Sequence, residues 1–163
     1  MEHLWTPWRM AYLQGEGNPE TGGCIFCDKL KGDDDSGFIL HRGWHAFVML
    51  NLYPYNNGHL LIAPYAHEPS IEPLDAATLG EMMALSQRGL RALGAAYQPL
   101  AFNLGINIGA AAGAGVADHV HLHVVPRWAG DTNYMAAVAE TRIIPEWVGQ
   151  TYERLKAIWP EVE

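Results

Sequence analysis

Three histidines that alternate with aliphatic residues are the part of this 163-residue sequence best suited to chemistry. They are His119, His121 and His123, within the stretch 119–127. Successive side chains of a β-strand point to opposite faces, so the imidazoles would lie in a row, about 6.5–7 Å apart, with the aliphatic residues facing a core. Packing alone explains such a row poorly, because imidazoles are costly to bury without partners. We predict that this histidine face binds a metal, attacks a substrate, or does both.

The middle histidine is the best candidate for a nucleophile. An imidazole nitrogen can attack a phosphorus or acyl centre when an acceptor holds its other nitrogen, and the neighbours of His121 could donate protons or orient the substrate. Directly upstream, residues 109–115 form a loop of small residues, whose backbone N–H groups can approach an anion closely. This pairing favours phosphate transfer over acyl transfer. The sequence contains neither a Gly-X-Ser-X-Gly elbow nor a Walker A motif.

Two cysteines form a Cys-X-X-Cys pair, Cys24 and Cys27. Structural zinc sites often take two of their four ligands from such a turn and the other two from elsewhere in the chain. His67 and His119 are the candidates for the remaining positions. The alternative is a pair of reduced cysteines buried near Phe26.

The elements that must position these residues are strands followed by helices. Apolar runs and turn signals predict strands at 38–40, 46–50, 59–63, 102–108 and 119–127, with loops at 31–37 and 51–58. Apolar steps of three and four predict a long helix from Asp75, its N-cap, to Tyr97, with Gly94 and Pro99 bracketing its end. Its stripe would face the core or a dimer interface. A second helix covers 145–160. The order predicts an α+β fold, with helices packed on a mostly antiparallel sheet.

Length and composition set limits on organisation and partners. The length suits a single domain, 1–163, in which residues 1–23 form an aromatic and glycine-rich extension. The formal net charge of −8 argues against nucleic acid and anionic membranes as partners, although it leaves room for a small anionic ligand. The uncharged stretch 92–117 contains amides, a proline and many glycines, so it is not a membrane span. We find no export signal at the start and expect a cytoplasmic protein.

The stretch 119–125 resembles the signature of the histidine triad (HIT) superfamily of nucleotidyl hydrolases and transferases, and the segment 50–64 is similar to a second conserved segment of that family. Residues 4–9, 24–27 and 125–133 look more specifically like the bacterial branch that includes diadenosine polyphosphate phosphorylases. The resemblance covers nearly the whole chain. It implies a HIT-like α+β fold and a homodimer that uses the long helix.

The resemblance also implies a role for each histidine of the row. His121 would attack the α-phosphate of a nucleotide and form a nucleotidyl-histidine intermediate, which water or inorganic phosphate would then release. His123 would contact the phosphate or the leaving group. His119 would support the strand, and in zinc-bearing members the matching histidine is a metal ligand, here with Cys24, Cys27 and His67. The substrate would be a dinucleoside polyphosphate such as diadenosine tetraphosphate, or a nucleotide conjugate.

Further residues would bind the substrate by the same resemblance. Asn51 would hold the ribose hydroxyls, while Phe26 and Leu52 would line the base pocket. The phosphates would meet Asn107 and the loop through Gly113 and Gly115, with His59 lying behind the residues that touch substrate. The chain departs from many members at one point: it has Gly115 followed by Val116, where they carry a serine or glutamine that helps with the phosphate or the leaving group.

Two alternatives stay open at this point. The protein could be a metallohydrolase in which all three histidines of the row ligate a catalytic zinc. It could also be a nucleotide-binding module with little turnover, which the departure at Gly115 motivates. Base preference, leaving group and the choice between water and phosphate as acceptor do not follow from the sequence.

Overall fold

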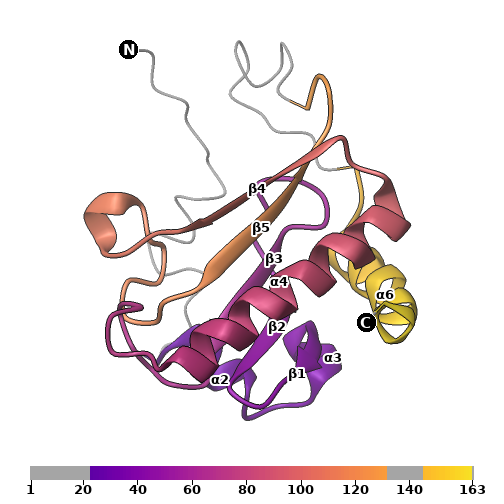
Figure 1. Cartoon of the computed structure of the whole chain (residues 1–163). Coiled ribbons are helices and arrows are strands. Elements are labelled where there is room, and N and C mark those ends of the chain that lie inside the picture. Colours follow the sequence, from indigo (N-terminus) through magenta and orange to yellow (C-terminus); the bar gives the residue numbers. More distant parts are fainter. Residues whose placement is uncertain (1–22, 132–144, 163) are drawn as a thin grey trace.

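The computed structural model describes residues 23–131 and 145–162. Its centre is a five-stranded antiparallel sheet of order β1-β2-β3-β5-β4 (Figure 1). The strands are β1 (Ile39–Arg42), β2 (Ala46–Leu50), β3 (Leu60–Pro64), β4 (Ala101–Ile106) and β5 (Leu122–Arg127). The helix α4 (Ala76–Tyr97) crosses one face of the sheet, and α6 (Val148–Ile158), continued by the 3₁₀ turn η2 (Trp159–Glu161), lies beside it. The predicted α+β fold is confirmed.

The main core fills the space between this face of the sheet and the two helices. Its buried side chains come from alternate positions of the strands and from one stripe of α4, and include Leu60, Ile62, Leu93, Leu122 and Val124. The helix begins as predicted, because the Asp75 carboxylate accepts a 2.7 Å hydrogen bond from the Thr78 N–H. It runs through Gly94 and ends just before Gln98, whose φ is 48°.

The opposite face of the sheet is covered near β1, β2 and β3 by the short helix α2 (Ile25–Lys29). Phe26 of α2 is buried there with Phe47, Met49 and Leu61. Strands β2 and β3 are therefore buried at every position, which explains why their sequences read as continuous apolar runs. The histidine face lies on this side of the sheet.

The structure corrects several predicted boundaries. The strand predicted at 119–127 begins at Leu122, because the pairing of β5 with both β3 and β4 stops at that residue. The strand predicted at 102–108 ends at Ile106, and the one predicted at 59–63 covers Leu60–Pro64. The first strand starts at Ile39, since Phe38 has a φ of 54°.

The loop predicted at 31–37 contains a short helix, α3 (Asp34–Gly37), whose N-cap Asp33 accepts from the Ser36 N–H. The helix predicted at 145–160 is shorter, at Val148–Ile158. The extension predicted at 1–23 falls outside the described residues except for its last position. None of the helices in 23–131 and 145–162 has both the length and the apolar character needed to cross a bilayer.

One carboxylate fastens the C-terminal helix to the loop 51–58. Glu146, 14% exposed at its side chain, accepts hydrogen bonds from Tyr97, Asn57 and Thr151, and from Arg154 at 2.8 Å. Burial alone would raise the pKa of this carboxyl, but the four hydrogen-bonded partners outweigh it and lower the pKa to about 2. Burial, together with the hydrogen bond to Glu146, raises the pKa of Tyr97 to about 12.

We expect Glu146 to make stability depend on pH in the acid range. A carboxyl whose folded pKa lies below its unfolded value stabilises the fold fully above the unfolded value of about 4.5, and this contribution is lost as the pH falls towards about 2. The shift corresponds to about 3 kcal/mol. Urea unfolding of the wild type and of Glu146→Gln at pH 7 and pH 3 measures this, and Glu153→Gln, on the helix α6 that follows Glu146, is the control. A gap between wild type and Glu146→Gln that is as large at pH 3 as at pH 7 would contradict it.

Candidate active and metal site

Strand β5 divides its side chains between the two faces of the sheet. Leu122 and Val124 point into the core beneath α4, so His123, Val125 and Arg127 lie on the other face. The alternation continues upstream of the strand. His119, His121 and His123 are buried, with 0%, 5% and 9% of their surfaces exposed. Each buried imidazole must therefore find partners, and those partners define its chemistry.

The four predicted metal ligands come together. One nitrogen or sulfur from each of Cys24, Cys27, His67 and His119 lies within 4.8 Å of the other three. Nδ1 of His119 is 3.3 Å from the Cys24 Sγ and 3.7 Å from the Cys27 Sγ, and Nδ1 of His67 is 3.4 Å from the Cys27 Sγ. Tetrahedral zinc with these donors places ligand atoms about 3.3–3.8 Å apart, so the residues fit the ion.

The elements that carry these four residues, and one hydrogen bond of His119, position their ligand atoms. Cys24 is the N-cap of α2 and Cys27 lies in its first turn, while His67 follows β3 and His119 precedes β5. The Nε2–H of His119 donates to the Pro64 carbonyl at 2.9 Å. That bond fixes the proton on Nε2 and leaves the Nδ1 lone pair facing the two thiols, as a metal-binding imidazole requires.

The nucleophile candidate His121 is held in the opposite tautomer. Its Nδ1–H donates to the backbone carbonyl of His119 at 2.9 Å, so the lone pair is on Nε2. Burial lowers the pKa of His121, against the opposing effect of this hydrogen bond, and keeps the ring neutral. The ring of Phe26 packs against it, with centroids 4.8 Å apart. A neutral, oriented imidazole with an available lone pair is what attack on phosphorus needs.

The hydrogen bond from His59 determines the tautomer of His123. The backbone N–H of Tyr55 donates to Nδ1 of His59 at 3.0 Å, which makes this nitrogen an acceptor and puts the proton on Nε2. The Nε2 of His59 lies 2.9 Å from Nδ1 of His123 and donates to it. His123 therefore carries its own proton on Nε2, beside the lone pair of His121, since the two rings are 4.8 Å apart. A lone pair and an N–H thus stand side by side.

The other predicted substrate-binding residues lie at different distances from the histidines along the chain and in the fold. The Asn51 side chain accepts from the Tyr53 N–H at 2.9 Å and lies 3.2 Å from Nδ1 of His59, at the base of the loop that also carries half-buried Leu52. Gly113, with a φ of 87°, follows the 3₁₀ turn Ala110–Ala112, and Gly115 is exposed. The roles predicted for these residues in ribose, base and phosphate binding stay predictions.

A further network holds the loop 51–58 against the end of β5; its residues lie in the segments 50–64 and 125–133, but the sequence did not predict their contacts. The Asp131 carboxylate, with its side chain 8% exposed, accepts from Nε and Nη2 of Arg127 at 2.6 and 2.8 Å and from the Trp128 N–H. It also accepts from the Asn56 amide at 2.9 Å, and the same amide donates to the Pro126 carbonyl. Asn56 follows Tyr55, so this network helps to set the N–H that determines the tautomers of His59 and His123.

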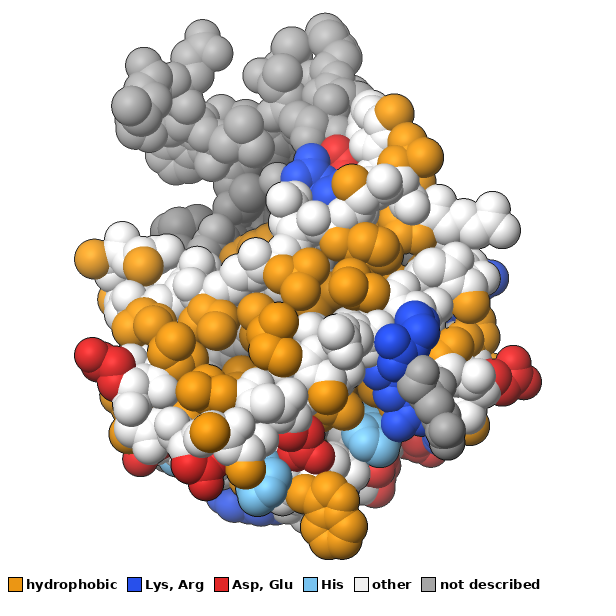
Figure 2. Space-filling model, in the orientation of Figure 1, with side chains coloured by type: hydrophobic (Ala, Val, Ile, Leu, Met, Phe, Trp, Pro, Cys, Tyr) orange, Lys and Arg blue, Asp and Glu red, His pale blue; other side chains and the backbone are white. Residues whose placement is uncertain are grey.

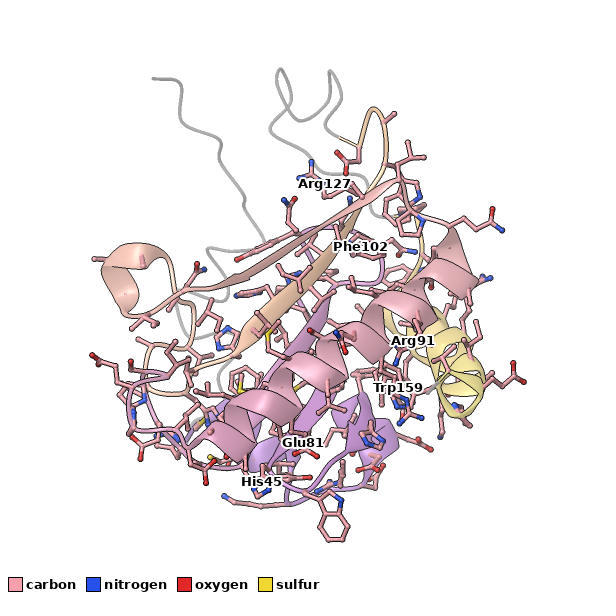
Figure 3. All side chains as sticks on the ribbon, viewed as in Figure 1. His45, Glu81, Arg91, Phe102, Arg127 and Trp159 are labelled. Atoms are coloured by element: carbon pink, nitrogen blue, oxygen red, sulfur yellow. The ribbon has the colours of Figure 1, made fainter. Side chains whose placement is uncertain are left out.

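A cavity of about 250 Å³ lies on the histidine face next to His123. Its walls come from the loop 51–58, from β4 and from the far end of β5, and are formed by Tyr55, Asn56, Asn103, Leu104, Gly105, Asn107, His123, Val125, Arg127 and Asp131. Figure 3 shows Arg127 at the end of this face, where β4 and β5 run side by side. The cavity thus extends the row of histidines along the strand.

Comparison with known proteins identifies the family. The HIT domain model matches residues 35–130. The chain is 34% identical over 165 residues to the AP-4-A phosphorylase of Mycobacterium tuberculosis, covering 98% of this chain and 85% of that protein. A Zn-bound histidine triad family protein from Mycobacterium smegmatis has a similar structure, with a TM-score of 0.66 and 27% identity over 85% of this chain and 94% of that one. The chain belongs to the HIT family, and the predicted resemblance is confirmed.

The metal site leads to a prediction about zinc content and stability. Purified protein is expected to hold one zinc per chain. His67→Ala removes one predicted ligand and is expected to lower both the zinc content and the thermal midpoint. A destabilisation of about 2 kcal/mol would lower Tm by about 4–8 °C in a chain of this size. Metal analysis and thermal melting measure both effects. His45→Ala, which alters an exposed histidine on the turn between β1 and β2 that is not one of the four clustered residues, is the control. Full zinc content in His67→Ala would show that the four residues do not act as one site.

Proposed function

We propose that this protein is a HIT-family nucleotidyl hydrolase or transferase that cleaves the α-phosphate linkage of dinucleoside polyphosphates, or of nucleotide conjugates, through a covalent intermediate on His121. The observation that carries the proposal is the pair of complementary tautomers. His121 presents a lone pair on Nε2, because its Nδ1–H is bound to the His119 carbonyl. His123 presents an N–H, because His59 donates to its Nδ1.

The reaction follows from these two atoms. Nε2 of His121 forms a bond to the α-phosphorus, and the bond from that phosphorus to the bridging oxygen breaks. The departing oxygen takes the electron pair, and the Nε2 proton of His123 is placed to neutralise it. An acceptor oxygen then attacks the α-phosphorus, its proton passes to His123, and the phosphorus–nitrogen electron pair returns to His121. Water as acceptor gives a nucleoside monophosphate, whereas inorganic phosphate gives a nucleoside diphosphate.

The substrate class rests on the relatives and on the residues around His121. The relative from M. tuberculosis named AP-4-A phosphorylase favours diadenosine tetraphosphate as the first compound to test. Asn51 would hold the ribose, Phe26 and Leu52 would border the base, and Asn107 with the loop through Gly113 and Gly115 would meet the phosphates. Phe26 is 1% exposed and packs against the rings of His119 and His121, so besides bordering the base it would support these two histidines from behind.

Zinc has a structural role in this proposal. When bound, it would neutralise the two thiolates and hold α2 against the start of the histidine row through Cys24, Cys27, His67 and His119. The metallohydrolase alternative is less well supported, because the Nδ1 atoms of the three histidines face three different partners: the thiols, the His119 carbonyl and His59. The alternative of a binding module without turnover is open to direct test.

We also propose that the protein forms a homodimer through α4 and the outer strand β4. A strand at the edge of a sheet offers unpaired backbone N–H and C=O groups, and β4 lies at such an edge. Hydrophobic side chains gather over β4 and α4 (Figure 2), among them Met83 and Leu104, which are 55% and 41% exposed. A second copy would cover both.

The dimer predicts a mass change. Leu104→Asp places a charge in the proposed interface and is expected to give monomers, because an unpaired charge is costly to bury. Light scattering after size exclusion measures the mass, and Trp44→Asp, at a 90% exposed residue on the turn between β1 and β2, is the control. A wild type that runs as a monomer at micromolar concentration would refute the proposed interface.

The catalytic proposal is tested by incubating the protein with diadenosine tetraphosphate, with and without inorganic phosphate. We expect ATP together with ADP when phosphate is the acceptor, and ATP together with AMP when water is. His121→Ala is expected to lower kcat by about a thousandfold or more, because it removes the proposed nucleophile. Acid-quenched wild type, digested and analysed by mass spectrometry, should carry a nucleotidyl group on His121.

The control for this experiment is His45→Ala, which removes an exposed histidine outside the row of three and should retain full activity. Full cleavage by His121→Ala would exclude the proposed nucleophile. Tight nucleotide binding without any product from the wild type would favour the binding-module alternative.

A further inference from the structure

We propose that the cavity beside His123 receives the polyphosphate chain of the leaving nucleotide, and that Gly105 keeps the space open for it. This inference rests on the proposed function and adds a binding site for the half of the substrate that departs. Three observations carry it: the direction of the cavity from His121, the hydrogen-bond donors along its walls, and the empty position at Gly105.

The first observation is the direction in which the cavity extends from the histidines. Nucleophilic displacement at phosphorus places the attacking and leaving atoms roughly in line, so the departing group must lie on the far side of the α-phosphorus from Nε2 of His121. The departing oxygen must also come within reach of the Nε2 proton of His123. The cavity begins at His123 and continues along β5 to Arg127, over about 13 Å of strand. A chain of linked phosphates leaving His121 past His123 would enter it.

The walls offer donors suited to phosphate oxygens. Asn103 accepts from Nη1 of Arg127 at 2.8 Å through its Oδ1, which leaves its NH₂ group for a ligand. Asn107 lies on the same wall, nearer the loop 109–115. Arg127 uses Nε, one N–H of Nη1 and one N–H of Nη2 on Asn103 and Asp131, so two of its five N–H groups remain. These groups form a row of N–H donors from the histidines to the end of the strand.

Gly105 supplies the room. It pairs with His123 across β4 and β5, so a side chain at this position would point to the histidine face beside that ring. A Cβ built on Gly105 meets no atom within 4 Å, and its φ lies outside the left-handed region. Neither packing nor backbone conformation therefore requires glycine here. A larger residue at position 105 would fit the fold but would occupy part of the cavity. The cavity volume of about 250 Å³ corresponds to roughly eight waters at about 30 Å³ each.

The test compares two substrates that share the transferred group and differ in the leaving group. Diadenosine tetraphosphate releases ATP, whereas adenosine 5′-phosphoramidate releases ammonia, which needs no cavity. In Gly105→Val the ratio of kcat/KM for the first substrate to that for the second should fall by at least about tenfold, and in Gly105→Ala by less. The transferred nucleotide is the same in both reactions, so the ratio isolates the leaving side.

The matched control is Ala101→Val. Ala101 is on the same strand and the same face, opposite Arg127, but it does not line the cavity, so the ratio should stay at the wild-type value. Size exclusion, zinc content and thermal melting of all variants show whether the assembly and the fold are kept. If Gly105→Val gives no cooperative melting transition, Gly105→Ala decides the question.

Two outcomes overturn the inference and are distinguishable. An unchanged ratio in folded Gly105→Val, or an equal loss on both substrates, would show that the cavity does not hold the leaving chain, while wild-type turnover leaves the proposed function in place. A wild type that cleaves neither substrate and forms no adduct on His121 would instead refute the proposed function, and this inference with it.

Discussion

His119 connects the predicted metal site and the proposed nucleophile through three atoms. Its Nε2–H is bound to the Pro64 carbonyl, which directs Nδ1 towards Cys24 and Cys27. Its own carbonyl accepts from Nδ1 of His121 and so fixes which nitrogen of that ring carries the lone pair for the proposed attack on phosphorus. A shift of this residue would disturb the metal ligands and the nucleophile together. The surrounding structure limits such a shift: the residue is fully buried, Phe26 packs against both rings, and the next N–H, of Val120, is bound to the Glu68 carbonyl. A structural metal at this point would therefore stabilise catalytic geometry without touching the substrate.

A second chain of hydrogen bonds reaches the site from the opposite end of β5. Asp131 binds Arg127 and Asn56, and the loop that carries Asn56 presents the Tyr55 N–H to His59, which in turn donates to His123. Glu146 binds the same loop at Asn57 from the side of α6. The loop is also closely packed at its end, since Gly58 has a φ of 76° and a Cβ there would lie 2.6 Å from Leu93. Two histidine tautomers thus depend on contacts whose donors and acceptors lie far apart in the sequence, and the sheet is what brings them to one face.

Much of this arrangement could be predicted from the sequence, for definite physical reasons. Alternation with period two placed the histidines on one face, and the Cys-X-X-Cys spacing with two spare histidines predicted the four residues that the fold brings together. Asp75 was predicted as the N-cap of the long helix and serves as one. The roles of Tyr55, Asn56 and Asp131 were not predicted, because the direction of a backbone N–H in an irregular loop leaves no periodic signal. The start of β5 was also missed, since the pairing of neighbouring strands ends it at Leu122, whatever the alternation upstream suggests. The short helix α3 was missed because its Asp33 cap lies in a polar run that reads equally well as a loop.

The proposed substrate is anionic, and the chain has a net charge of −8. The site would bind such a substrate with oriented neutral N–H donors. Burial keeps His121 neutral, and Arg127, the one guanidinium among the described residues that line the cavity, is balanced by Asp131. Recognition would then rest on N–H groups of His123, Asn103, Asn107 and the small-residue loop. Neutral donors in a partly buried site can stabilise phosphate oxygens strongly when they are already oriented, because no reorganisation is needed as charge develops. Neutral donors also avoid the long-range attraction that would retain a highly charged product. A neutral imidazole donates only from the nitrogen that carries its proton, so each histidine near the reacting atoms needs a partner that fixes that proton. Gly115, where the resemblance leads one to expect a serine or glutamine, needs no such side chain in a site whose other N–H groups already point to where the charge develops.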